Sequence, residues 1–174
     1  RSRIALYACH TNLDSAPGGM SWRLAAELGI GALRVLEPAA GKGEGAGFGV
    51  VGELPDAVPT LDYLRGVGRR LGVGALRHSA VVHERVRRVA VCTGAGGSLI
   101  GEALRAGAEL YLTADLKYND FMTPSGRLTV ADIGHFESEY CAIELLFDIF
   151  SKNLRTFAVR KSGCSCNPVS YLCL

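Results

Sequence analysis

The sequence predicts a layered α/β domain in which a mixed β-sheet is flanked by helices. Short apolar runs typical of buried strands alternate with segments whose apolar residues recur at helical spacing. Some strand-like runs follow one another without an intervening helix, which indicates antiparallel as well as parallel pairing. The chain has 174 residues, of which 48% are hydrophobic, so it can bury a substantial core without disulfide support.

The expected elements are short and are separated by turn-forming residues. Residues 38–49 are rich in Ala and Gly and predict a flexible connection. We expect strands at residues 4–9, 48–54, 74–82, 86–92, 110–113, 128–133 and 156–160. We expect helices at residues 21–28, 60–71, 98–106 and 134–153.

Charge and composition argue against several classes of function. The formal net charge is +2 and the basic residues are scattered, so the electrostatic footprint of a nucleic-acid-binding protein is lacking. No apolar run approaches the ~18 residues of a membrane span, and we expect a cytoplasmic protein. Three cysteines lie in apolar segments typical of buried thiols, and three cluster without the paired spacing of a zinc site. The first three are Cys9, Cys92 and Cys141, and the others are Cys164, Cys166 and Cys173.

The segment from Gly134 to Glu139 carries the strongest combination of metal-binding side chains. If a helix begins at Gly134, His135 and Glu139 lie four positions apart on one face and can share one cation. An imidazole and a carboxylate suit Zn, Fe, Mn or Co better than Ca or Mg. The alternative is a first-turn histidine beside a solvated helix carboxylate, and the spacing alone leaves it open.

Two further segments follow predicted strands and offer polar groups. His10 and Asp14 come after the first strand, where α/β sheets project side chains into a ligand-binding crevice, so both are candidates for a metal site. The alternative is that Asp14 begins the turn toward Pro17. The loop 93–98 either offers backbone N–H groups to an anion or simply turns the chain tightly between a strand and a helix.

Three segments in a fixed order identify a resemblance. They are Tyr7–Asp14 followed by Pro17–Gly19, then Thr113–Tyr118, and then Asp132–Glu139. In these segments the chain resembles the Nif-three-like dinuclear-metal family, also called the GTP cyclohydrolase I type 2 homologues. The residues Asn167–Leu172 look like the tail of family members that carry an inserted domain.

The resemblance implies a two-metal centre in a ring-shaped, hexameric, cytoplasmic protein. It implies that Asp14 ligates one divalent ion, that His135 ligates the other, and that Glu139 bridges them. The ions would be Zn, Fe, Mn or Co. His10 would lie beside the metals and move protons, and Lys117 would meet a small anionic substrate.

The chain departs from the family pattern in two respects. It has no adjacent pair of histidines, whereas family members supply one imidazole to each metal from such a pair, and Asn119 stands where a histidine is common. We therefore expect a Nif-three-like domain that lacks its N-terminal part and the inserted domain. Residues 1–40 would belong to the N-terminal half of the metal-binding domain, residues 41–47 to a flexible junction or the site of a missing insertion, and residues 48–174 to the C-terminal half.

Two functions are consistent with these features. One is a metal-dependent hydrolase of a nucleotide, a phosphoester or a cyclic amide. The other is a non-catalytic metal-binding hexameric assembly or regulatory protein. A hydrolase needs open coordination positions, whereas a structural site is saturated by protein ligands. A third outcome is that the chain binds no metal because the histidine pair is absent.

Overall fold

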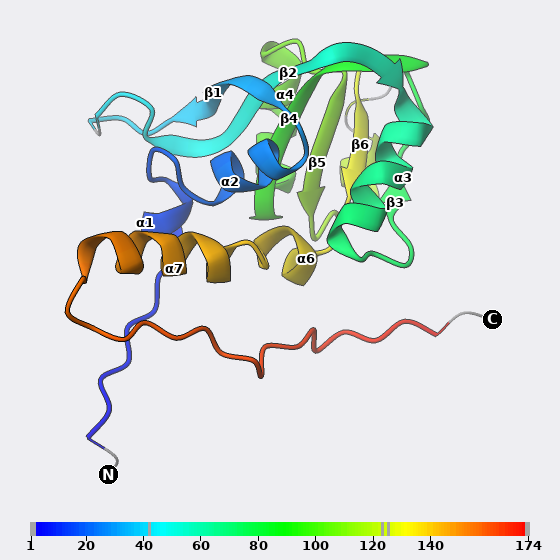
Figure 1. The fold of residues 1–174 in the computed structure, drawn as a ribbon. Coiled ribbons are helices and arrows are strands. Elements are labelled where there is room, and N and C mark those ends of the chain that lie inside the picture. The colour runs from blue at the N-terminus through cyan, green and yellow to red at the C-terminus, as the bar shows by residue number, and fades with distance from the viewer. Residues whose placement is uncertain (1–2, 42, 123, 125, 173–174) are drawn as a thin grey trace.

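The computed structural model describes residues 3–41, 43–122, 124 and 126–172. They form a mixed sheet of six strands with helices on both faces (Figure 1). The strands are β1 (Gly31–Pro38), β2 (Gly47–Pro59), β3 (Arg77–His78), β4 (Arg85–Ala95), β5 (Leu110–Ala114) and β6 (Thr129–Asp132). The α-helices are α1 (Thr11–Asp14), α2 (Met20–Glu27), α3 (Thr60–Leu71), α4 (Ile100–Arg105), α5 (Tyr118–Met122), α6 (His135–Glu139) and α7 (Ala142–Asn153), and a short 3-10 helix spans Gly97–Leu99. Within these ranges no helix has the length and apolarity that crossing a membrane requires.

The strand order is β1-β2-β4-β5-β6-β3, and it contains both kinds of pairing. β4, β5 and β6 are parallel to one another, whereas β1, β2 and β3 each pair antiparallel with their neighbours. The predicted layered domain with a mixed sheet is confirmed. Because parallel strands end at the same edge of a sheet, the residues that follow β4, β5 and β6 are brought close together.

The two faces of the sheet bury separate hydrophobic clusters, as the alternation along β4 shows. Val89 and Val91 pack into the cluster that contains Leu24 of α2, whereas Ala90 and Cys92 pack into the opposite cluster. Successive strand residues point to opposite faces, so one strand can contribute to both clusters. In Figure 1, α6 and α7 lie across the end of the sheet beneath α2.

The helix prediction at residues 60–71 is confirmed by α3. Pro59 precedes its first residue, and Gly72 ends it in the left-handed conformation with φ +71°. Leu64 and Val67 are buried on its inner side. The apolar residues that predicted this helix therefore recur at helical spacing because they face the core.

Strand β1 was not predicted, and the flexible connection expected at residues 38–49 is shorter than expected. β1 is the edge strand, and most of its residues are exposed, so it lacks an apolar run. It pairs with β2 in a hairpin, in which the backbone N–H of Ala39 donates to the carbonyl of Ala46 over 2.9 Å. Residues 38 and 47–49 belong to the paired strands.

Two predicted strands are wrong, and two other elements are shorter than expected. Ile4, Leu6 and Tyr7 are 81, 95 and 76% exposed, and neither 4–9 nor 156–160 is a strand. An apolar run becomes a strand only when a neighbouring strand pairs with it, and in the described part of the chain neither segment pairs with the sheet. Of residues 74–82, only β3 is a strand, and the helix predicted at 134–153 is broken between α6 and α7.

Candidate metal centre

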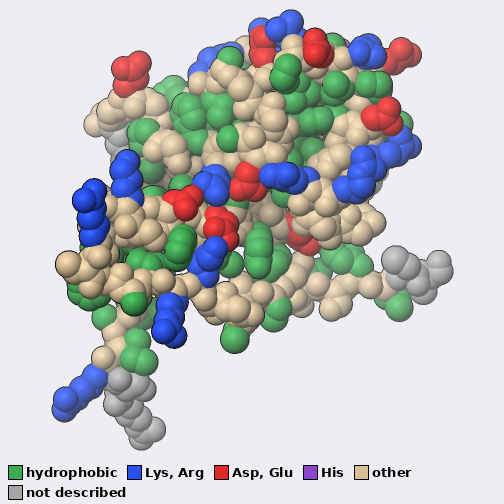
Figure 2. Space-filling view, viewed as in Figure 1, with side chains coloured by type: hydrophobic (Ala, Val, Ile, Leu, Met, Phe, Trp, Pro, Cys, Tyr) green, Lys and Arg blue, Asp and Glu red, His purple; other side chains and the backbone are tan. Residues whose placement is uncertain are grey.

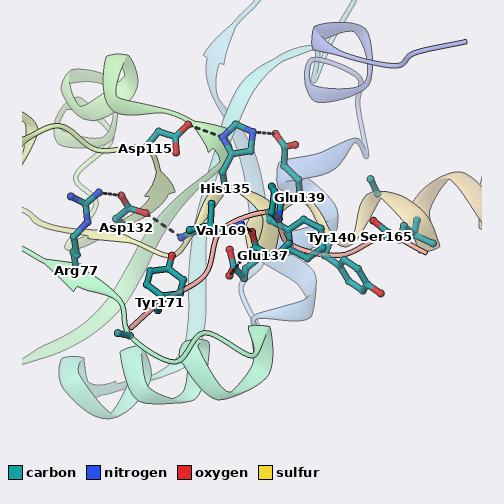
Figure 3. Close-up of a pocket in the computed structure, with 17 residues that line it drawn as sticks. Arg77, Asp115, Asp132, His135, Glu137, Glu139, Tyr140, Ser165, Val169 and Tyr171 are labelled. Carbon is teal, nitrogen blue, oxygen red and sulfur yellow. Dashed lines mark hydrogen bonds and ion pairs between the residues drawn. The ribbon is translucent and has the colours of Figure 1, made fainter. Parts of the chain in front are cut away.

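The imidazole of His135 lies between two carboxylates. Its Nδ1 is 2.8 Å from Oδ2 of Asp115, and its Nε2 is 3.3 Å from Oε1 of Glu139 (Figure 3). Asp115 follows β5, and His135 begins α6 just after β6. Glu139 lies one turn further along α6, on the same face as His135. The pairing of His135 with Glu139 that the sequence spacing predicted is therefore present.

The contact with Asp115 orients the imidazole. A carboxylate only accepts hydrogen bonds, so Nδ1–H of His135 donates to Asp115. The lone pair of a neutral ring then lies on Nε2 and faces another acceptor, Oε1 of Glu139. Burial lowers the pKa of His135, but the hydrogen bond to Asp115 and the charge of Glu139 raise it by more, so the pKa lies above its usual value. The position between Nε2 and Oε1 therefore favours a proton or a cation.

This donor set fits a divalent ion. A histidine whose Nδ1–H is held by a carboxylate is the usual arrangement around protein-bound metals, because it fixes the ring and makes Nε2 more basic. Nε2 of His135 and Oε1 of Glu139 lie 3.3 Å apart, so both atoms could contact one ion. His135 and Glu139 therefore have the chemistry and the spacing to share one ion.

Asp14 lies within electrostatic range of His135, but the three predicted ligands do not form a closed cluster. Burial raises the pKa of the Asp14 carboxyl, and the charges of His10 and His135 oppose this shift. Among the residues with described positions, no three His, Cys, Asp or Glu side chains converge closely enough to hold a metal ion as they stand. The His135–Glu139 pair is thus the assembled part of the predicted site.

The C-terminal end of β4, where the segment 93–98 begins, lies against one side of the His135–Glu139 pair. Gly94 has φ +64°, and a Cβ atom built on it would clash with Oε1 of Glu139 and lie 3.4 Å from Cε1 of His135. Buried hydroxyl groups fix the loop: the N–H of Gly94 donates to Oγ of Ser138 over 3.0 Å, and Thr113 donates from Oγ1 to the Gly94 carbonyl over 3.1 Å. The absence of a side chain at Gly94 therefore leaves room for the Glu139 carboxylate.

Replacing Gly94 by alanine should displace Glu139 from His135. The left-handed backbone alone costs an alanine about 1 kcal/mol, and the steric conflict should add about 1–3 kcal/mol. Gly72→Ala is the matched control, because Gly72 has φ +71° and a Cβ there meets nothing within 4 Å. The free energy of unfolding, measured by equilibrium denaturation, should fall further in Gly94→Ala than in Gly72→Ala. The ¹⁵N shift of the His135 ring should also change more in Gly94→Ala. Equal effects in the two variants would show that the Glu139 contact is unimportant.

Asp132, at the end of β6, holds the segments that carry Asp115 and His135. Its Oδ2 accepts hydrogen bonds from the backbone N–H of Leu116 over 3.1 Å and from Arg77, and its Oδ1 accepts one from the N–H of Gly134 over 3.1 Å. The Asp132 side chain is only 9% exposed. Leu116 adjoins Asp115 and Gly134 adjoins His135, so one buried carboxylate ties together the loop that carries Asp115 and the loop that carries His135.

His10 and Lys117, the other two predicted site residues, occupy different surroundings. His10 is exposed and precedes α1, and its charge affects Asp14 at the end of that helix. Lys117 is exposed two residues after Asp115, and its backbone N–H donates to Oδ2 of Asp120 over 2.7 Å. His10 therefore lies close to the predicted ligand Asp14, whereas Lys117 is connected to Asp115 only through the chain.

The cysteines in the described part of the chain carry free thiols. Cys92 and Cys141 are free and buried, as expected of core thiols, whereas Cys9 is free but only half-buried because the segment 4–9 lies outside the sheet. Burial raises the pKa of Cys92 to about 11, so this side chain does not offer a thiolate near neutral pH. Cys164 and Cys166 are free and exposed, and Cys173 lies outside the described residues.

A cleft of about 780 Å³ opens beside the candidate centre. His135, Glu139 and Asp115 line one part of it. The rest of the wall includes Arg77 of β3, Phe136, Glu137 and Tyr140 in and just after α6, and the first turn of α7. It also includes the C-terminal tail, which we define as residues 154–172. The tail runs back beneath α7 and α6 (Figure 1). The site therefore has space for a ligand next to the His135 imidazole.

Sequence reasoning missed the residues that organise the site. Asp115 was visible as part of a polar corner after a buried strand, and this position could have marked it as a candidate. The roles of Ser138 and Asp132 depend on contacts with Gly94 and Leu116, which are distant in sequence. No local pattern signals such contacts.

Comparisons with known proteins agree with the resemblance seen in the sequence. A family model described as Duf34/NIF3 (NGG1p interacting factor 3) matches residues 1–168. A protein of Clostridium perfringens named GTP cyclohydrolase 1 type 2 homolog is 33% identical over 143 residues, which cover 80% of this chain and 53% of that protein. A protein of the same name from Archaeoglobus fulgidus is 31% identical over 160 residues, covering 91% and 62%. The chain thus spans little more than half the length of these curated relatives.

Solved structures share the fold. The crystal structure of a Bacillus cereus protein related to NIF3 superposes with a TM-score of 0.84 at 19% identity, covering 97% of this chain and 74% of that one. A structure titled protein ybgI, unknown function, gives a TM-score of 0.72 at 30% identity, covering 84% and 57%. The sheet and its flanking helices are therefore common to these proteins.

Proposed function

The chain belongs to the Duf34/NIF3 (NGG1p interacting factor 3) family, and on that premise we propose that it is a metal-dependent hydrolase built on a dinuclear centre. The proposed ligands are Asp14, His135 and Glu139, with Glu139 between two divalent ions. Zn, Fe, Mn and Co are the candidate ions, because they accept imidazole and carboxylate together. The whole protein's activity is part of this proposal.

One observation carries the proposal, namely the array of Asp115, His135 and Glu139. Nδ1–H of His135 is already held by Asp115 over 2.8 Å, so Nε2 is aimed at the Glu139 carboxylate without a change of rotamer. Preorganised ligands of this kind are expected where a metal must bind in a fixed orientation. Gly94 leaves room for the Glu139 carboxylate, and Ser138 fixes the backbone of Gly94. A glutamate that merely extends into solvent would require neither feature.

The residues around the centre have separate roles in this proposal. When bound, the ions would supply Lewis acidity toward a substrate oxygen and lower the pKa of water. His10, exposed beside Asp14, moves a proton to or from the reacting groups. Lys117 balances the negative charge of a small anionic substrate. Asp115 keeps the His135 ring in place throughout.

The substrate class is left as a nucleotide, a phosphoester or a cyclic amide. The curated relatives carry the name GTP cyclohydrolase 1 type 2 homolog, which supports a nucleotide as one of these classes. The alternative function is a non-catalytic hexameric assembly or regulatory protein. Exposed apolar side chains at Ile4, Leu6 and Tyr7 favour an interface with a partner and so support this alternative. Its hexameric state and cytoplasmic location are predictions from the family resemblance.

A substrate screen tests the hydrolase. Nucleotides, phosphodiesters and cyclic amides would be offered to the protein with Mn, Zn, Fe or Co, and turnover should depend on the added metal. His10→Ala should lower turnover by about 100-fold, because a proton carrier is lost, while the metal content stays the same. His78→Ala is the control, since His78 is an exposed histidine on β3. Absence of metal-dependent turnover with all three substrate classes would favour the assembly.

A further inference from the structure

The cleft beside His135 has an apolar wall that the proposed chemistry does not use. Phe136 and Tyr140 pack with their ring centroids 5.3 Å apart and their planes at 47°. Both line the cleft, together with Ile143 of α7 and Val169 and Tyr171 of the tail. Tyr140, Val169 and Tyr171 are more than half exposed. An aromatic and aliphatic surface left open beside polar groups is typical of a site for a flat organic ligand.

The charges of the cleft are predominantly acidic. Arg77 is paired with Asp132, and His135 lies between Asp115 and Glu139, so each basic side chain already has at least one carboxylate partner. Figure 2 shows hydrophobic side chains gathered between the body and the tail, with acidic side chains close above them. A ligand of this cleft is therefore better matched if it brings positive charge or N–H donors.

Glu137 is the acidic group best placed to recognise such a ligand. Its Oε1 accepts a hydrogen bond over 2.8 Å from the neutral amide of Asn167 in the tail, so its charge is not balanced by this partner. In Figure 3 the Glu137 carboxylate lies between Tyr140 and Tyr171. A ring resting on the aromatic wall would present its edge to this carboxylate. Aromatic faces also attract cations, so the wall and the carboxylate favour the same ligand.

We propose that the cleft binds a flat aromatic ring that carries a cationic or N–H-rich edge, with the ring on Tyr140 and the edge on Glu137. The proposal rests on the proposed function, because the ring would lie beside the metal centre, and it names the substrate class that the same site recognises. Of the candidate substrates, it selects those with an amino-substituted heteroaromatic ring. Recognition by Glu137 and Tyr140 does not require a bound metal.

Benzamidine and benzoate test the proposal, because they are flat rings of similar size and opposite charge. Each would be titrated into the metal-free protein and followed by NMR chemical shifts. Benzamidine should bind about tenfold more tightly than benzoate, which corresponds to the combined effect of one partly exposed ion pair and one cation–π contact. The shifts should be confined to residues around Glu137 and Tyr140. Equal affinity for the two probes, or no binding of benzamidine, would overturn the proposal.

Two variants and their controls separate the two parts of the site. Glu137→Gln keeps an oxygen that can accept the hydrogen bond from Asn167 but removes the charge, so the tenfold preference for benzamidine should fall to the part that the cation–π contact supplies, about threefold. Tyr140→Ala should weaken the binding of both probes about threefold or more. Glu84→Gln and Tyr118→Ala alter exposed residues outside the cleft and should change neither affinity. A preference that Glu137→Gln leaves undiminished would contradict the assigned role of this carboxylate.

The test also distinguishes this proposal from the proposed function. Failure of the metal centre would appear as absence of metal binding, with the preference for benzamidine intact. Failure of the aromatic site would appear as normal metal binding without that preference. Because Glu137 and Tyr140 are not proposed metal ligands, their variants should retain the metal content of the unmodified protein.

Discussion

Glu139→Ala is expected to lose both metal ions. Glu139 is the proposed bridge, and its Oε1 lies 3.3 Å from Nε2 of His135, so its removal takes a donor from each ion at once. Losing a residue that merely orients a ligand weakens metal binding about 10- to 100-fold, and losing a bridging ligand should exceed this. Elemental analysis after incubation with Zn, Mn, Fe or Co and removal of unbound ions would measure the metal content per chain.

Glu144→Ala provides the matched control for this result. Glu144 is an exposed glutamate on α7 that pairs with Lys161 over 2.7 Å, and it lies outside the candidate centre. This variant should keep the metal content of the unmodified protein. Equal metal content in Glu139→Ala and the unmodified protein would refute the ligand assignment. An unmodified protein that retains no metal would show that Asp14, His135 and Glu139 do not hold ions by themselves.

Asp132→Ala is expected to lower the free energy of unfolding by about 3 kcal/mol, because it leaves the backbone N–H groups of Leu116 and Gly134 without their acceptor. The substitution also removes the carboxylate with which the Arg77 guanidinium forms an ion pair. Since Leu116 and Gly134 adjoin Asp115 and His135, the hydrogen bond between those two side chains should weaken as well. Urea denaturation would measure the stability, and the ¹⁵N shifts of the His135 ring would report the hydrogen bond.

Asp62→Ala is the control for Asp132→Ala. Asp62 also pairs with an arginine, Arg65, over 2.8 Å, but both side chains are exposed on α3. Exposed pairs contribute little, so this variant should cost less than about 0.5 kcal/mol. A similarly small cost for Asp132→Ala would mean that solvent replaces the buried carboxylate without penalty, and its role in joining the two loops would have to be abandoned.

The elements that could be predicted from the sequence are those whose buried residues form a regular pattern along the chain. α3 has apolar residues on one face, and β5 is buried throughout, so each left a clear pattern. β1 shows no such pattern, because most of its residues are exposed and polar and apolar residues are mixed along it. The segment 4–9 shows the opposite failure, since its composition suits a buried strand but nothing in the described chain pairs with it.

The candidate site was predictable only where its geometry is local. His135 and Glu139 are four residues apart on one helix, and their contact follows from the helical repeat. The contact of Asp115 with His135 joins the ends of β5 and β6, and the Gly94–Ser138 hydrogen bond spans 44 positions. Such contacts exist only once the parallel strands have been placed side by side.

Three parallel strands end at the same rim of the sheet: Gly94 lies near the end of β4, Asp115 follows β5, and His135 follows β6. Asp132 at the end of β6 and the hydrogen bond between Asp115 and His135 couple the last two of these positions. A substitution in either loop is therefore expected to disturb the other, so a new specificity at this rim would have to be engineered in both loops together.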